Sequence, residues 1–128
     1  MKILLAIAKL DLRLSIELIL SHEPNVQVIG TASTSDGLLA LLETSGPDMI
    51  LVDWTLPGAL APELIPELIK NNKSIKIIVI GEDPASRSIA LRAGAKAFVN
   101  HGAPPELFLD AFRRVRFEHE SANQSSSN

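Results

Sequence analysis

The 128-residue sequence contains no cysteine, which excludes disulfide bonds, thiol-based catalysis and zinc–thiolate sites. Aromatic residues make up only 4% of the chain, too few for a surface on which nucleic-acid bases stack. The 15 acidic and 12 basic residues give a net charge of −3, whereas nucleic-acid-binding domains are usually strongly basic. Composition therefore argues against cysteine chemistry and against direct binding to nucleic acid.

The sequence also lacks an apolar run long enough to cross a membrane. The first apolar run, 3–8, is similar to the start of an export signal, but it stops at Lys9 and charged residues follow from Asp11 onward. We therefore expect a cytoplasmic protein with no membrane partner. A glycine-rich phosphate-binding loop is absent too, so nothing in the sequence favours a nucleotide site of that kind.

Apolar residues make up 46% of the chain, and the length is typical of one domain with its own core. Short apolar runs alternate with stretches of helical spacing. The expected strands are 3–8, 26–31, 49–53, 75–80 and 96–100, and the expected helices are 12–21, 37–44, 63–71, 83–93 and 104–118. We expect a domain over 1–119, followed by a polar segment, 120–128, that is a disordered tail or the start of a linker.

Several helix ends carry a recognisable signal. Asp11 is expected to cap the first helix, and Asp83, before Pro84, to open the fourth. Gly94 is expected to end that fourth helix. Pro66 has no backbone N–H, so it must lie in the first turn of its helix or kink it.

Five strands that alternate with five helices predict right-handed βαβ units and a parallel sheet. In open sheets of this kind, chemistry is found at the carboxyl ends of the strands. Those ends are expected at Ile7-Ala8, Thr31, Asp53, Ile80-Gly81 and Asn100-His101. A carboxylate in such a position, that of Asp53, is exposed at the crevice and can act as a nucleophile.

Three segments carry a similarity to a known family: 50–58 (ILVDWTLPG), 93–99 (AGAKAFV) and 103–107 (APPEL). With the order of the elements, they resemble the receiver domain of bacterial response regulators in two-component signalling, over about residues 2–118. We therefore expect a flavodoxin-like (βα)5 three-layer sandwich with a parallel five-stranded sheet in the order 2-1-3-4-5. The resemblance also implies a phosphorelay role with a histidine kinase or an output protein as partner, and no enzyme activity is expected.

The resemblance assigns roles to single positions. Asp53 aligns with the aspartate that accepts a phosphoryl group, whose charge is normally neutralised by Mg²⁺ and a lysine. The family's acidic pair at the end of the first strand aligns with Ile7 and Ala8. Its phosphate-contacting threonine or serine aligns with Gly81, and its lysine aligns with His101. Of the usual set, this sequence keeps only the phosphoacceptor.

Magnesium prefers near-octahedral oxygen ligation, and the expected ligands are only Asp53 and the backbone carbonyl of Thr55. We therefore expect no cofactor, and a pseudo-receiver that acts by protein–protein interaction. The alternative is a competent phospho-accepting receiver that uses Asp53 with weak or atypical help from Mg²⁺. Substitute ligands would then come from Asp11, Glu82 or Asp83, although helix capping competes for the two aspartates. A third hypothesis is a small-molecule-binding flavodoxin-like domain.

Phe98 aligns with the family's switch aromatic residue. Because Gly81 has no hydroxyl to bind phosphate, Phe98 is expected either to be packed inward permanently or to be an ordinary core residue. His101 is either a cationic substitute for the lysine or a half-exposed loop residue. His22 and His119 are expected to be solvated residues at helix ends, and no two histidines have metal-ligand spacing.

Basic side chains recur on the last two expected helices and the strand between them. They are Arg87, Arg92, Lys96, Arg113, Arg114 and Arg116. In the family this face often forms a homodimer or docks an output domain, whereas a run of charges is more commonly a solvated helix face. Interspersed acidic residues argue against contact with DNA.

Overall fold

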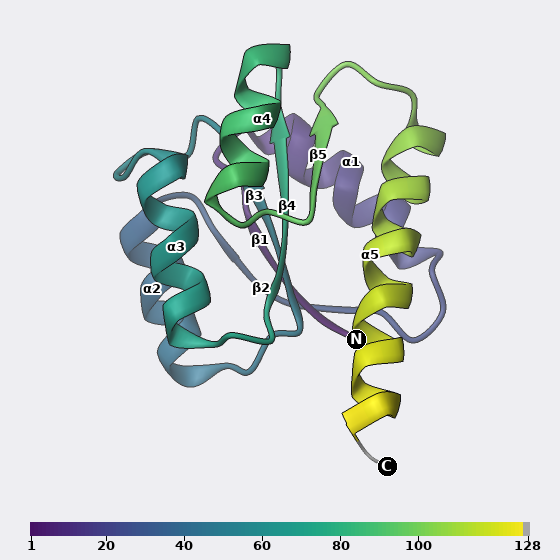
Figure 1. The fold of residues 1–128 in the computed structure, drawn as a ribbon. Helices are drawn as coiled ribbons and strands as arrows, with labels where there is room; N and C mark the ends of the chain where they lie inside the picture. Colours follow the sequence, from purple (N-terminus) through teal and green to yellow (C-terminus); the bar gives the residue numbers. More distant parts are fainter. Residues whose placement is uncertain (127–128) are drawn as a thin grey trace.

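Five parallel strands form a sheet in the order β2-β1-β3-β4-β5 in the computed structural model, which describes the backbone of residues 1–126 and the side chains of residues 1–121. The strands are β1 (Lys2–Ala6), β2 (Gln27–Ala32), β3 (Met49–Asp53), β4 (Lys76–Gly81) and β5 (Ala97–Asn100). The helices are α1 (Leu10–Ser21), α2 (Ser35–Thr44), α3 (Ala61–Asn71), α4 (Pro84–Ala93) and α5 (Pro105–Ser126). Figure 1 shows the sheet between two layers of helices, which confirms the predicted flavodoxin-like sandwich.

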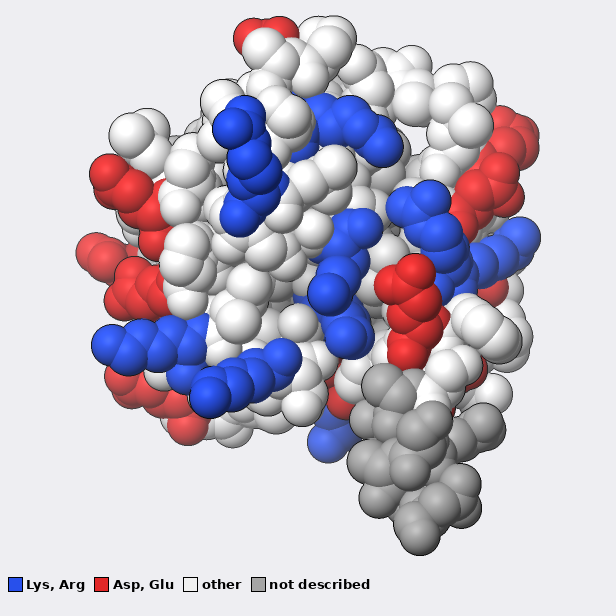
Figure 2. Space-filling view, in the orientation of Figure 1, with Lys and Arg blue, Asp and Glu red and all other residues white. Residues whose placement is uncertain are grey.

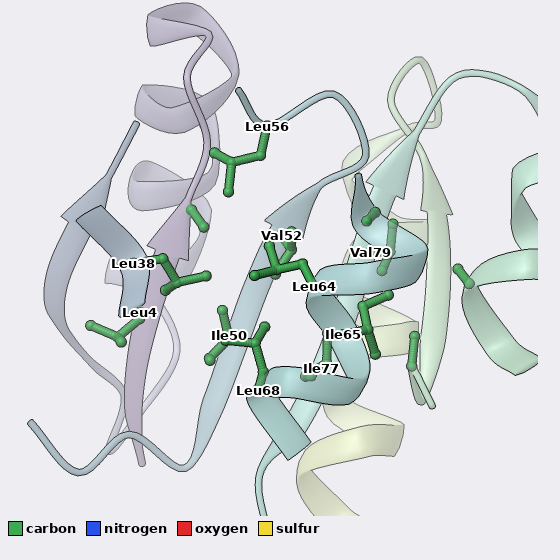
Figure 3. Packing of buried hydrophobic residues seen from close by; sticks show 14 of the residues in the cluster. Leu4, Leu38, Ile50, Val52, Leu56, Leu64, Ile65, Leu68, Ile77 and Val79 are labelled. Atoms are coloured by element: carbon green, nitrogen blue, oxygen red, sulfur yellow. The ribbon is translucent and has the colours of Figure 1, made fainter. Parts of the chain in front are cut away.

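Two apolar clusters fill the spaces between the sheet and its helices. Ile50 and Val52 of β3 pack with residues of α2, α3 and α4, and Figure 3 shows the centre of this cluster. Met49 and Leu51 point to the opposite face and pack with α1 and α5. Successive side chains of a strand alternate between faces, so a strand covered on both sides reads as one continuous apolar run. The continuous apolar run therefore allowed the bounds of β3 to be predicted correctly.

The start of α1 differs from the prediction. β1 ends at Ala6 instead of Ala8, and α1 begins at Leu10 with Lys9 at its N-cap position. Asp11, predicted as the cap, lies inside the first turn, and the side chain of the N-cap residue makes no capping hydrogen bond to the helix. The prediction for Asp11 was therefore wrong. In the first turn its negative charge still interacts favourably with the helix dipole.

The other helix-end signals are confirmed. Asp83 caps α4, with its Oδ1 accepting the N–H of Ala85 at 2.9 Å. Gly94 ends α4 at a φ of +121°, where a Cβ atom would also collide with Ile69. Pro66 lies inside α3, beyond its first turn, and its side chain is exposed. One intrahelical hydrogen bond is lost there, because proline has no N–H to donate.

α5 extends further than predicted, to Ser126 instead of about Glu118. Its backbone therefore continues as a helix into the segment 120–128, which was predicted as a tail or linker, while 127–128 lie outside the described residues. His119, predicted as solvated, is only 8% exposed, and its Nε2 lies 3.6 Å from Oδ1 of Asp48. Within residues 1–126, no helix has both the length and the apolar character needed to cross a bilayer.

Candidate functional site

A cavity of about 210 Å³ lies at the carboxyl ends of β3 and β4. Its lining residues are Lys9, Asp53, Trp54, Thr55, Gly81, Glu82, Asp83, Ser86 and His101. The structure thus brings Asp53, Gly81 and His101 together, as the sequence analysis expected. It adds Lys9 and Ser86, which sequence reasoning did not single out.

Asp53 ends β3 and is only 3% exposed, so it is buried at the cavity and not exposed as predicted. Its Oδ1 accepts the backbone N–H and the hydroxyl of Thr55, both at 3.1 Å. Its Oδ2 is buried and has no hydrogen-bond partner among the described residues. Buried polar groups nearly always have a partner, so this oxygen is the candidate binding atom of the cavity.

The side chains around Asp53 do not fit a dedicated Mg²⁺ site. Ile7 is buried and apolar, Ala8 has no ligand atom on its side chain, and neither is among the residues that line the cavity. Glu82 and Asp83 line the cavity, but one faces Lys9 and the other caps α4. Across the part of the chain that the structure describes, no three histidine or acidic side chains are grouped so that they could hold a metal ion.

Gly81 and Phe98 are packed against each other. A Cβ atom at position 81 would lie 2.8 Å from Cζ of Phe98 and 3.2 Å from Cβ of Trp54. Real Cβ atoms essentially never approach other heavy atoms as closely as 2.8 Å. Phe98 is only 8% exposed, so its ring is packed inward and occupies space that a side chain at position 81 would need.

His101 follows β5, and its backbone N–H donates to the carbonyl of Gly81 at 2.8 Å. This bond fixes the backbone of His101 beside the end of β4. Its side chain is 35% exposed, and Nδ1 lies 4.0 Å from Oε1 of Glu82. The acidic neighbour of the imidazole in the structure is therefore Glu82, while Asp53 lies deeper in the same cavity.

Lys9 is the basic residue of this site that sequence reasoning missed. Its Nζ lies 3.4 Å from Oε1 of Glu82, and both side chains are largely exposed. The available signal was its position in the sequence, directly after the two residues that replace the family's acidic pair. Asp11, weighed as a substitute ligand, lines a neighbouring groove on α1 and not the cavity of Asp53.

A second groove lies between α4, β5 and α5. Its lining residues are Arg87, Phe98, Val99, Asn100, Ala103, Leu107, Asp110, Ala111 and Arg114. Two other arginines of α5 are engaged in ion pairs, Arg113 with Glu23 and Arg116 with Glu120. Figure 2 shows lysine and arginine side chains spread over the middle of this side of the molecule, with most acidic side chains toward its edges. The surface is therefore mixed in charge.

Comparison with known proteins identifies the family. The family model described as "Response regulator receiver domain" matches residues 8–113. The chain belongs to this family. The receiver domain is 30% identical over 106 residues to the response regulator GacA of Pseudomonas aeruginosa, which covers 80% of this chain and 49% of that protein. It is 29% identical over 106 residues to the nitrate/nitrite response regulator protein NarL of Escherichia coli K12, covering 81% of this chain and 49% of that protein.

The receiver domain spans about half the length of these curated relatives. Among solved structures, the response regulatory domain of protein mrkE from Klebsiella pneumoniae matches with a TM-score of 0.87 at 12% identity, covering 94% of this chain and 99% of that one. At that identity the likeness shows the fold alone. The predicted family, a receiver domain of two-component response regulators, is confirmed by the family match.

Proposed function

We propose that this receiver domain signals without phosphoryl transfer, as a protein-binding module and not as an enzyme. Its partner would be a histidine kinase, an output protein or a second copy of the chain. The observation that carries this proposal is the packing of Phe98 against Gly81, where a Cβ atom would lie 2.8 Å from the ring.

The packing at Gly81 removes the link between phosphorylation and a change of shape. The family uses a hydroxyl at this position to contact the phosphoryl group, and the aromatic residue moves inward in response. Here the hydroxyl is absent and the ring of Phe98 already occupies the adjoining space. Tightly packed interiors change between discrete arrangements, so a filled site favours one fixed arrangement.

No cofactor is needed for this function. Ile7, whose apolar side chain is buried, and Ala8 align with the family's acidic pair, and neither side chain offers an oxygen ligand to Mg²⁺. Mg²⁺ would be required only under the alternative hypothesis, in which Asp53 still accepts phosphate.

The groove between α4, β5 and α5 is the surface we propose for a protein partner or a homodimer. Phe98 lines it, so the inward position of the ring fixes part of its shape. Arg87, Arg114 and Asp110 give it charges of both signs. Such a surface suits a protein partner better than a uniformly negative nucleic acid.

One observation favours the alternative of a competent phosphoacceptor: Oδ2 of Asp53 has no partner and lies in a cavity. A free carboxylate oxygen is what a nucleophile requires. The small-molecule hypothesis is less well supported, because a cavity of about 210 Å³ is smaller than ligand pockets of about 300–1,000 Å³.

The test is the intact mass of the protein after incubation with acetyl phosphate and Mg²⁺. We expect no mass gain for the unmodified sequence. A gain of one phosphoryl group that is lost in Asp53→Asn would contradict the proposal and establish the alternative.

A matched positive control restores the family's groups in the same fold. The variant combines Ile7→Asp, Ala8→Asp, Gly81→Thr and His101→Lys, with Phe98→Leu to make room for the new threonine. We expect this variant to gain a phosphoryl group under the same conditions. Its labelling would show that a negative result for the unmodified sequence arises from the replaced residues and not from the assay.

A further inference from the structure

The buried Oδ2 of Asp53 requires a partner that donates hydrogen bonds or carries positive charge. An unpaired charge in a protein interior is costly, since it has lost its water without gaining a substitute. Thr55, the neighbouring donor, already directs both its N–H and its hydroxyl to the other oxygen, Oδ1. A partner supplied by the protein itself would come from another residue that lines the cavity.

Lys9 is the cationic side chain best placed to supply that partner. It lines the cavity together with Asp53, and a lysine carries three donors on a long flexible stem. Its pairing with Glu82 spans 3.4 Å between side chains that are 48% and 70% exposed. Exposed ion pairs of this kind are weak, so Lys9 is held only loosely at the rim.

The other groups of the cavity are less suited to this role. The Nδ1 of His101 lies beside Glu82, 4.0 Å from its Oε1. Ser86 lines the cavity but is uncharged. Mg²⁺ in this cavity would meet the ammonium group of Lys9 at the rim.

We propose that Lys9 is the resident cation of the Asp53 cavity, with its ammonium group donating to Oδ2 in place of the divalent metal. The side chain would exchange between Glu82 at the rim and Asp53 inside. This inference deepens the proposed function, because it gives the site a charge balance that needs neither metal nor phosphate. It does not depend on any partner protein.

Two double-mutant cycles test the assignment, with unfolding in urea as the readout for the unphosphorylated chain without added metal. The first combines Lys9→Met with Asp53→Asn, and the second combines Lys9→Met with Glu82→Gln. We expect a favourable coupling between Lys9 and Asp53 of at least about threefold in the unfolding equilibrium constant. The coupling between Lys9 and Glu82 should be smaller, because both side chains are exposed.

Lys70→Met, combined with Asp53→Asn, is the matched control, because Lys70 is an exposed lysine of the last turn of α3 and does not line the cavity. It should show no coupling to Asp53. Coupling of Lys9 to Glu82 but not to Asp53, or equal coupling of Lys70 and Lys9 to Asp53, would overturn the assignment. Phosphoryl labelling in the mass experiment would overturn the proposed function and not this cycle, so the two failures are distinguishable.

Discussion

Two aspartates lie at opposite ends of β3, and their surroundings differ. Asp48, just before the strand, accepts the backbone N–H of Lys2 through Oδ2 at 2.8 Å, and its Oδ1 lies 3.6 Å from Nε2 of His119. Asp53, the last residue of the strand, accepts hydrogen bonds from Thr55, two residues further along, and from no other residue that the structure describes. One carboxylate joins distant parts of the chain, and the other makes only local bonds.

This contrast separates a structural carboxylate from one that is available for function. Asp48 connects β1, β3 and α5 at the amino end of the sheet, and both its oxygens face a partner. Asp53 lies at the carboxyl end, where open parallel sheets place their ligands, and one of its oxygens has no partner within the described part of the chain. We therefore expect substitutions at Asp48 to cost more stability than substitutions that remove the local bonds of Asp53.

The largest expected loss of stability follows from adding a side chain at position 81, the carboxyl end of β4. Gly81→Thr returns the family's hydroxyl, but its Cβ would lie 2.8 Å from the ring of Phe98. Overpacking of this kind should lower the free energy of unfolding by about 2–3 kcal/mol. Urea unfolding followed by the fluorescence of Trp54, the only tryptophan, measures the change.

Two further variants test whether the loss of stability in Gly81→Thr arises from contact with Phe98. Gly46→Thr introduces the same side chain where, apart from the two chain neighbours, no heavy atom of the described residues lies within 4 Å of the new Cβ, so it should change stability by less than about 0.5 kcal/mol. Adding Phe98→Leu to Gly81→Thr should recover part of the loss. Equal losses from the two glycine variants would mean that Phe98 does not occupy the space at position 81.

A smaller loss of stability is expected from a substitution at the amino end of β3. Asp48→Ala removes the acceptor of the Lys2 N–H and the acidic neighbour of the buried His119. We expect the free energy of unfolding to fall by about 1–2 kcal/mol, the range for a hydrogen bond to a charged group with a partly exposed partner. The same urea experiment measures it.

Glu67→Ala is the control for Asp48→Ala, because it removes an exposed carboxylate from α3. Its effect should stay within about 0.5 kcal/mol. If the two variants were equally stable, Asp48 would be an ordinary surface residue, and the contrast between the two ends of β3 would not hold.

Much of the fold could be predicted because its signals are local. The four apolar residues of β3, 49–52, define a strand covered on both faces, and the pair Asp83-Pro84 defines the start of α4. The start of α1 could not be placed, because Lys9 and Asp11 are both polar residues near a helix end and only the backbone decides between them. The length of α5 was missed, since a serine-rich composition is typical of tails.

The site, like the fold, has a part that could be predicted from the sequence and a part that could not. Alignment with the family placed Asp53, Gly81 and His101 at strand ends, and strand ends of a parallel sheet meet at one edge. The contribution of Lys9 was missed because it depends on the direction of a side chain in a loop. The pairing of His119 with Asp48 joins residues 71 positions apart (119 minus 48), which no local pattern indicates.

The smallest expected effect concerns the local bonds of Asp53. Thr55→Val keeps the shape of the side chain but removes the hydroxyl that donates to Oδ1, while the backbone N–H of residue 55 still donates there. Because Thr55 is exposed, we expect a loss of only about 0.5 kcal/mol in urea unfolding. Thr31→Val, at an exposed position of β2, is the matched control and should be neutral. A loss from Thr55→Val as large as that from Asp48→Ala would mean that Asp53 is also a structural carboxylate, held by its neighbour as firmly as Asp48 is held by β1 and α5.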